Sequence, residues 1–175
     1  MDNAVMQNLA REQQLEQWIV RYGNTILHTC IIYLTDIGQA EDAMQDVFLK
    51  AWRCMHQFEG RNGCSEKTWL MQITINICHD YHRSKWFKHV DTAKALYDVQ
   101  THVDVVSSED RDLLNDIFTL PIKYKQVILL YYYQEMTLKE IAEVLNISRS
   151  TIHHRLQKAQ EMLKRKLIGR NLDGE

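Results

Sequence analysis

The chain has 175 residues, of which 45% are hydrophobic and 25% charged, so it can form one globular domain or two small ones. Its net charge of −2 does not by itself indicate a nucleic-acid binder. The four cysteines include no Cys-x-x-Cys pair, no signal peptide opens the chain and no apolar run approaches membrane-spanning length. These features argue against zinc, redox and membrane-inserted classes, and we expect a cytoplasmic protein without cofactor or metal.

The front half is predicted to be helical. Apolar residues recur at helical spacing from Leu15 to Leu34, and residues 36–38 break the pattern. A second helix is predicted over residues 39–57, a loop over residues 59–65, and a third helix from about Glu66 to beyond Arg83. Because only one proline occurs and no stretch alternates like a strand, we expect an all-α fold.

The back half is predicted to form a second helical domain. Residues 90–108 lose amphipathic periodicity and are interpreted as a linker. A short helix over residues 109–118 is followed by Pro121, which fits the first turn of another helix. The expected architecture is therefore two small helical domains, residues 1–89 and 109–175, joined by the linker.

Residues 137–166 have the pattern of a helix-turn-helix. Thr137 can cap the first helix and Glu140, three residues on, can complete a capping box. Asn146 stands at the turn, where a residue tolerant of the left-handed region is needed, and Ser148 can cap the second helix. In this motif the second helix reads DNA base edges and phosphates.

The charge distribution supports this interpretation. From Ser148 to Arg170 there are seven basic residues and a single acid, Glu161. Residues 1–83 carry seven basic and ten acidic side chains, whereas residues 111–175 carry eleven and eight. A helical hairpin with a solvated basic face is the alternative, but such a face more often mixes both signs. We therefore expect DNA binding by the back half and a different partner for the front half.

The second predicted helix has two faces. One is an apolar stripe that should be buried, formed by Met44, Val47, Phe48, Ala51, Trp52 and Met55. The other is acidic with one apolar member, formed by Glu41, Asp42, Gln45, Asp46 and Leu49. Periodicity alone favours an ordinary solvated face here, and docking on a basic partner helix is the functional alternative.

The third predicted helix is apolar over much of its circumference except along one line. That line comprises Trp69, Gln72, Asn76, Asp80 and Arg83, and cations mix with aromatic residues just beyond it, at Lys85 to His89. Such a mixture can hold phosphates while bases stack on rings. The alternative is that Trp69 and Trp86 are core residues beside solvated lysines.

Together the two halves resemble the sigma-70 family of bacterial transcription initiation factors, and within it the extracytoplasmic-function (ECF) type. The resemblance is carried by AEDAMQDVFLKAW at residues 40–52, KTWLMQITINICHDYHRS at residues 67–84, and LPIKYKQVILLYYYQEMTLKEIAEVLNISRSTIHHRLQKAQEML at residues 120–163. Residues 1–89 are similar to domain two of that family and residues 109–175 to domain four.

The resemblance implies a role for each surface. The helix at residues 40–52 would bind the clamp coiled coil of core RNA polymerase through Asp42, Gln45, Asp46 and Leu49. The melted strand of the −10 promoter element would meet Trp69, Asn76, Asp80, Arg83 and Lys85, with the loop at residues 59–67 completing a pocket for an extruded base. The −35 duplex would meet Arg149, Ser150, His153, His154, Arg155 and Lys158.

The implied function is promoter recognition within an RNA polymerase holoenzyme. In such a mechanism the chain itself makes and breaks no bond, and an anti-sigma factor commonly holds the protein inactive. One rival is a stand-alone helix-turn-helix regulator, which leaves the acidic front helix unexplained. A second is a metal-dependent enzyme using Cys78, His79, Asp80 and His82, although four neighbouring residues of one helix could not all face one ion.

Overall fold

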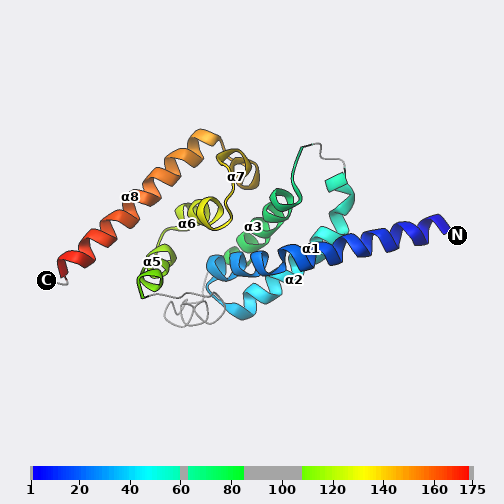
Figure 1. Ribbon diagram of the computed structural model, residues 1–175, viewed down its shortest axis with the longest axis horizontal. Helices are drawn as coiled ribbons and strands as arrows, with labels where there is room; N and C mark the ends of the chain where they lie inside the picture. The colour runs from blue at the N-terminus through cyan, green and yellow to red at the C-terminus, as the bar shows by residue number, and fades with distance from the viewer. Residues whose placement is uncertain (1, 60–62, 85–107, 174–175) are drawn as a thin grey trace.

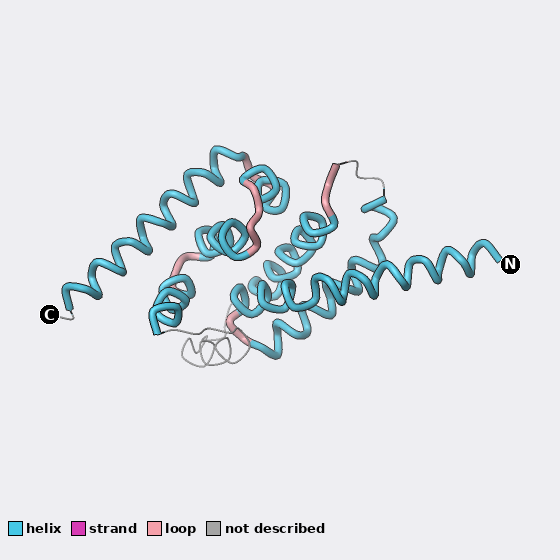
Figure 2. Tube along the Cα trace, in the orientation of Figure 1, coloured by secondary structure: helices cyan, strands magenta, loops and turns pink. Residues whose placement is uncertain are grey.

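The computed structural model describes residues 2–59, 63–84 and 108–173. Within these ranges the chain consists of helices and short connections, with no strand, in agreement with the expected all-α fold (Figure 2). Lys85 and residues 90–107 of the predicted linker lie outside the described residues. We refer to residues 2–84 as the N-terminal unit and to residues 108–173 as the C-terminal unit.

The N-terminal unit contains three helices, α1 (Asp2–Leu34), α2 (Ile37–Glu59) and α3 (Glu66–Ser84). Thr35 takes a positive φ of 56° between α1 and α2, and the Asp36 carboxylate caps α2 by accepting a hydrogen bond from the Gln39 amide at 2.9 Å. Helix α1 starts far before the Leu15 expected from apolar spacing, and its first turns extend beyond the other two helices (Figure 1).

Three aromatic side chains form one end of the N-terminal core. The ring centroid of Trp18 on α1 lies 5.3 Å from Trp69 on α3 and 5.7 Å from Phe58 on α2, and Phe58 lies 5.4 Å from Trp69. Each helix thus contributes one large ring, and burial of such rings dominates the energetics of a small core. This cluster fixes how α1, α2 and α3 pack.

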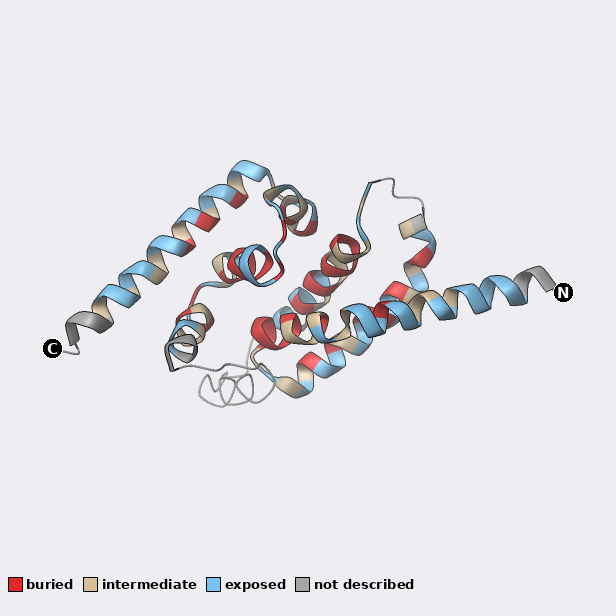
Figure 3. Cartoon of the chain, in the orientation of Figure 1, coloured by how far each residue is buried: buried red, intermediate tan, exposed pale blue. Residues whose placement is uncertain are grey.

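The C-terminal unit contains α5 (Ser108–Phe118), α6 (Ile122–Ile128), the π-helical turn η1 (Leu129–Tyr133), α7 (Leu138–Leu145) and α8 (Arg149–Asp173). In η1 the Gln134 amide donates to the Leu129 carbonyl at 3.0 Å, the i to i+5 spacing of a π-helix. Buried residues follow one side of α8 and exposed residues the other (Figure 3).

The two units touch directly. Helix α3 packs against α7, and α1 contacts α6, so helices distant in sequence lie side by side (Figure 1). Hydrogen bonds join the two units, and the buried hydrophobic residues of both belong to one continuous core. One consequence is that the surfaces of the two units are held in one relative arrangement.

Candidate protein-binding and nucleic-acid interfaces

The helix-turn-helix begins with the predicted capping box. The Thr137 hydroxyl accepts a hydrogen bond from the Glu140 amide at 3.3 Å, and the Glu140 carboxylate accepts one from the Thr137 amide at 2.8 Å. The bond from the Thr137 backbone is the main reason why the pKa of Glu140 is lowered from its ordinary value. Two amides at the start of α7 are thereby satisfied without water.

The turn between the helices also follows the prediction. Asn146 has φ 51° and ψ 46°, in the left-handed region, and its amide bonds back to the Ala142 carbonyl. The Ser148 hydroxyl then accepts a hydrogen bond from the Thr151 amide at 3.2 Å, which caps α8. These local contacts set the direction in which α8 leaves α7.

Helix α8 buries one side and presents the predicted DNA-reading side to solvent. Ile152, Leu156 and Ala159 are buried in the same core as Ile141 and Val144 of α7, which α8 contacts. The opposite side carries all six residues predicted to meet the −35 duplex, most of them exposed and the rest partly exposed: Arg149, Ser150, His153, His154, Arg155 and Lys158. A rigid helix with an outward row of donors and cations has the form needed to enter a major groove.

One cation of this row has an intramolecular partner. The Lys158 ammonium lies 3.2 Å from the Glu161 carboxylate, one turn along α8. Both side chains are well exposed, so the pair contributes little to stability. Its effect is to reduce the positive charge available to a phosphate at this position.

The acidic face of α2 is exposed as the functional interpretation requires. Asp42, Gln45, Asp46 and Leu49 all lie at the surface, and Leu49 is 51% exposed although it is apolar. The Tyr81 hydroxyl of α3 donates to the Asp46 carboxylate at 2.7 Å. Burial and this carboxylate together raise the pKa of Tyr81 to about 12, so the tyrosine stays a neutral donor.

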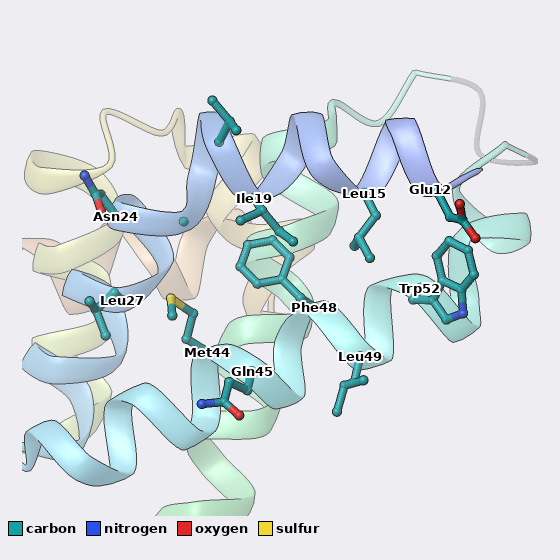
Figure 4. Close-up of a pocket in the computed structure, with 12 residues that line it drawn as sticks. Glu12, Leu15, Ile19, Asn24, Leu27, Met44, Gln45, Phe48, Leu49 and Trp52 are labelled. Atoms are coloured by element: carbon teal, nitrogen blue, oxygen red, sulfur yellow. The ribbon is translucent and has the colours of Figure 1, made fainter. Parts of the chain in front are cut away.

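An open apolar groove of about 910 Å³ adjoins this face, between α1 and α2. Its walls come from Ile19 and Val20 on one helix and from Gln45, Leu49 and half-buried Trp52 on the other. Figure 4 shows Leu15 and Ile19 of α1 directed towards Phe48, which forms the buried base. The amino-acid sequence did not indicate that α1 contributes to this surface. In the structure, Val20 is 88% exposed and Ile19 is 45% exposed.

The sequence contains one sign that α1 contributes to the groove, namely a glycine inside a long helix. Gly23 lies within a long helix and lines the groove, yet a Cβ atom at this position would meet no other atom within 4 Å. Glycine destabilises a helix interior relative to alanine. Among the described residues, no packing contact therefore demands glycine here, and its effect is to leave space in the groove.

The line of α3 residues predicted to meet the −10 strand is only partly available. Asn76, Asp80 and Arg83 are exposed on successive turns, and Lys85 lies outside the described residues. The prediction for Trp69 was wrong, because this side chain is only 3% exposed and packs in the aromatic cluster described above. We therefore remove Trp69 from the candidate site and keep the other members.

The residues of the metal-enzyme alternative do not converge. Cys78 is buried with its sulfur 3.7 Å from that of Cys30, whereas His79, Asp80 and His82 are exposed. The contact with Cys30 and burial both raise the pKa of the Cys78 thiol, which disfavours the thiolate that binds metals. Among the described residues, no group of three His, Cys, Asp or Glu side chains is arranged to hold a metal ion.

Comparison with known proteins agrees with this arrangement. Residues 18–88 match the family description "Sigma-70 region 2" and residues 117–163 match "Sigma-70, region 4". The ECF RNA polymerase sigma factor SigW of Bacillus subtilis (strain 168) is 30% identical over 161 residues, covering 83% of this chain and 84% of SigW. A probable RNA polymerase sigma factor, RfaY of Xanthomonas campestris pv. campestris, is 26% identical over 156 residues, and the chain spans only 38% of its length.

Solved structures show the same fold. CnrH in complex with the cytosolic domain of CnrY superposes with a TM-score of 0.67 at 20% identity, covering 90% of each chain. The sigma factor RpoE of Bartonella quintana, solved with the anti-sigma factor NepR, gives a TM-score of 0.68 at 20% identity and covers 89% of this chain and 97% of that one. Within the described residues, none of the helices is long and apolar enough to cross a membrane.

A helix-turn-helix on one unit and an acidic, partly apolar face on another define a DNA-binding transcription factor with a protein partner. The chain belongs to the sigma-70 family of RNA polymerase sigma factors, in its extracytoplasmic-function type. Its function is to bind core RNA polymerase and to direct it to promoters for transcription initiation.

Proposed function

We propose that the α1–α2 groove and the acidic face of α2 together form the polymerase-binding surface. The observation that carries this proposal is that Gln45 and Leu49 belong to both the predicted face and the groove wall. A continuous surface with an apolar centre and acidic neighbours suits an amphipathic helical partner with a basic flank. Asp42 and Asp46 would supply the acidic flank.

The promoter-binding roles are divided between the units. The exposed line of Asn76, Asp80 and Arg83 on α3 would contact the unpaired −10 strand, and the outward side of α8 would contact the −35 duplex. With this division, residues 1–89 act as domain two and residues 109–175 as domain four. The chain would make and break no bond itself, and would act in the cytoplasm, where polymerase and promoter DNA meet.

An anti-sigma factor is the second protein partner that we propose. The structural relatives CnrH and RpoE of Bartonella quintana were solved in complex with CnrY and with the anti-sigma factor NepR. An exposed apolar groove that is open in the isolated chain offers a site where such a protein could compete with polymerase.

The proposal is tested by reconstituting the chain with core polymerase and selecting promoters from random DNA. Leu49→Asp, which puts a charge on the groove wall, should weaken core binding by about ten-fold or more. Leu113→Asp is the matched control, because Leu113 is an exposed leucine of α5 remote from the groove, and it should bind core polymerase like the parent.

Two results would count against the proposal. Equal core affinity of the Leu49 and Leu113 variants would remove the groove from the polymerase interface. Specific binding of duplex DNA by a chain that never copurifies with core polymerase would favour the stand-alone regulator instead.

A further inference from the structure

Two cysteines from different helices meet inside the N-terminal core. Cys30 on α1 and Cys78 on α3 are both fully buried, and their sulfur atoms lie 3.7 Å apart. This is a non-bonded contact between two free thiols, since the sulfur atoms of a disulfide are about 2.05 Å apart. The two positions are 48 residues apart in the sequence, so no Cys-x-x-Cys spacing announces the pair.

The packing of α1 on α3 holds the two sulfur atoms together. On one side of the pair, the rings of Trp18 and Trp69 lie 5.3 Å apart, and on the other side those of Tyr33 and His79 lie 5.5 Å apart. The contacts follow the same order along both helices, so α1 and α3 run in the same direction with the cysteines between two ring contacts. Sliding one helix along the other would break these contacts, so the thiols stay adjacent.

The pair is inert while the core is closed. The hydrogen bond to Cys30 and burial both raise the pKa of the Cys78 thiol, so the reactive thiolate is disfavoured. Buried thiols of this kind pack as small apolar groups. Local opening of the core admits water and small solutes, and it is the step that would expose the sulfur atoms to a reagent. The other two cysteines, Cys54 and Cys64, are half-buried and serve as internal comparisons.

We propose that Cys30 and Cys78 form an oxidation site, at which an oxidant of the peroxide class joins α1 to α3 through a disulfide. In the first step one thiol sulfur attacks a peroxide oxygen, the O–O bond breaks, and a sulfenic acid and one water are formed. In the second step the other thiol attacks the sulfenic sulfur, the S–S bond forms, and the oxygen leaves as a second water. Two electrons pass from the two thiols to one molecule of hydrogen peroxide.

The crosslink would act on the stability of the N-terminal unit. It closes a loop from residue 30 to residue 78 that contains all of α2, so the three helices could no longer separate fully on unfolding. Restricting the unfolded chain in this way stabilises the folded one. Disulfides of cytoplasmic proteins are commonly redox-responsive, and this one would form only after exposure to peroxide. The inference is independent of the polymerase and DNA contacts proposed above.

The experiment uses the full-length Cys54→Ala/Cys64→Ala variant, which keeps only the two core thiols. After treatment with hydrogen peroxide, the mass of the intact chain should fall by two hydrogen atoms, and peptide mapping should join the segments of Cys30 and Cys78. Dithiothreitol in urea should restore the mass. Cys30→Ala in the same background is the matched control, because its single core thiol can form no crosslink within the chain.

Two further readouts test the physical argument. The oxidised variant should unfold at a urea concentration about 1–2 M higher than the reduced one, as followed by tryptophan fluorescence. Peroxide should leave the midpoint of the Cys30→Ala control unchanged. Oxidation should also be faster in urea below the unfolding transition, because opening of the core limits access to the thiols.

The decisive measurement needs no substitution in the core. The inference would be overturned if the folded Cys54→Ala/Cys64→Ala variant kept both thiols under peroxide treatment that fully oxidises glutathione. Crosslinks only between two chains, or sulfinic acid in place of the disulfide, would overturn it as well. A disulfide between Cys30 and Cys78 that left the urea midpoint unchanged would show that the crosslink does not restrain the three helices, which the proposal requires.

Discussion

Lys125 provides a stability prediction whose size can be worked out from its surroundings. This lysine of α6 is only 7% exposed, and among the described residues its ammonium lies over the ring of Phe118, at 5.5 Å. Burial lowers the pKa of Lys125 from 10.5 to about 8. The charged form is therefore less stable in the folded chain than in the unfolded one.

The sign and the pH window follow from these two pKa values. Below about pH 8 both states bind the proton, and the fold carries the full cost of the buried charge, about 3 kcal/mol for this difference in pKa. Between pH 8 and pH 10.5 the folded state releases the proton first, so stability rises with pH. Above pH 10.5 this cost is absent.

Lys125→Met, which keeps the length of the side chain without the charge, should raise the free energy of unfolding at pH 7 by about 3 kcal/mol. At about pH 10 the gain should fall below about 1 kcal/mol. Urea denaturation of parent and variant at both pH values measures this, with Lys123→Met on the exposed side of α6 as the control. A variant that is no more stable than the parent, or a gain independent of pH, would refute the reasoning.

Three further predictions concern other parts of the molecule. Thr137→Ala should lower the free energy of unfolding by about 1 kcal/mol through loss of the capping box, and Thr137→Ser should restore most of it in the same denaturation assay. Lys158→Ala should reduce the salt dependence of −35 duplex binding by about 0.9 in log–log slope, whereas Glu161→Gln, which frees the same cation, should strengthen binding at low salt. Gly23→Ala should raise the melting temperature, because alanine favours the helix by about 0.5–1 kcal/mol and its methyl group meets no clash.

The helix-turn-helix could be predicted because its determinants are local. The contacts of Thr137 with Glu140, of Asn146 with Ala142 and of Ser148 with Thr151 each join residues three or four positions apart. Residue type and spacing therefore contain almost all the information needed. The exposure of the α8 row follows as well, because Ile152, Leu156 and Ala159 place the apolar side of that helix unambiguously.

Trp69 shows where spacing along one helix stops being sufficient. Leu70, Met71, Ile75 and Cys78 are also buried, so α3 packs over much of its circumference. On such a helix, a line of polar residues that includes one tryptophan does not indicate whether the tryptophan is buried or exposed. Trp69 packs against Trp18 of α1 and Phe58 of α2, and the sequence of α3 carries no signal of these contacts.

The contact between the units could not be predicted from the sequence either, because it joins residues that lie far apart in the chain. In the sequence, Gln126 and Gln134 look like ordinary surface residues, because nothing near them requires an amide. Their hydrogen-bond partners, Tyr33 and Thr29, lie 93 and 105 positions away. A buried amide is tolerated only where such a partner exists, so separation of the units must return both side chains to water.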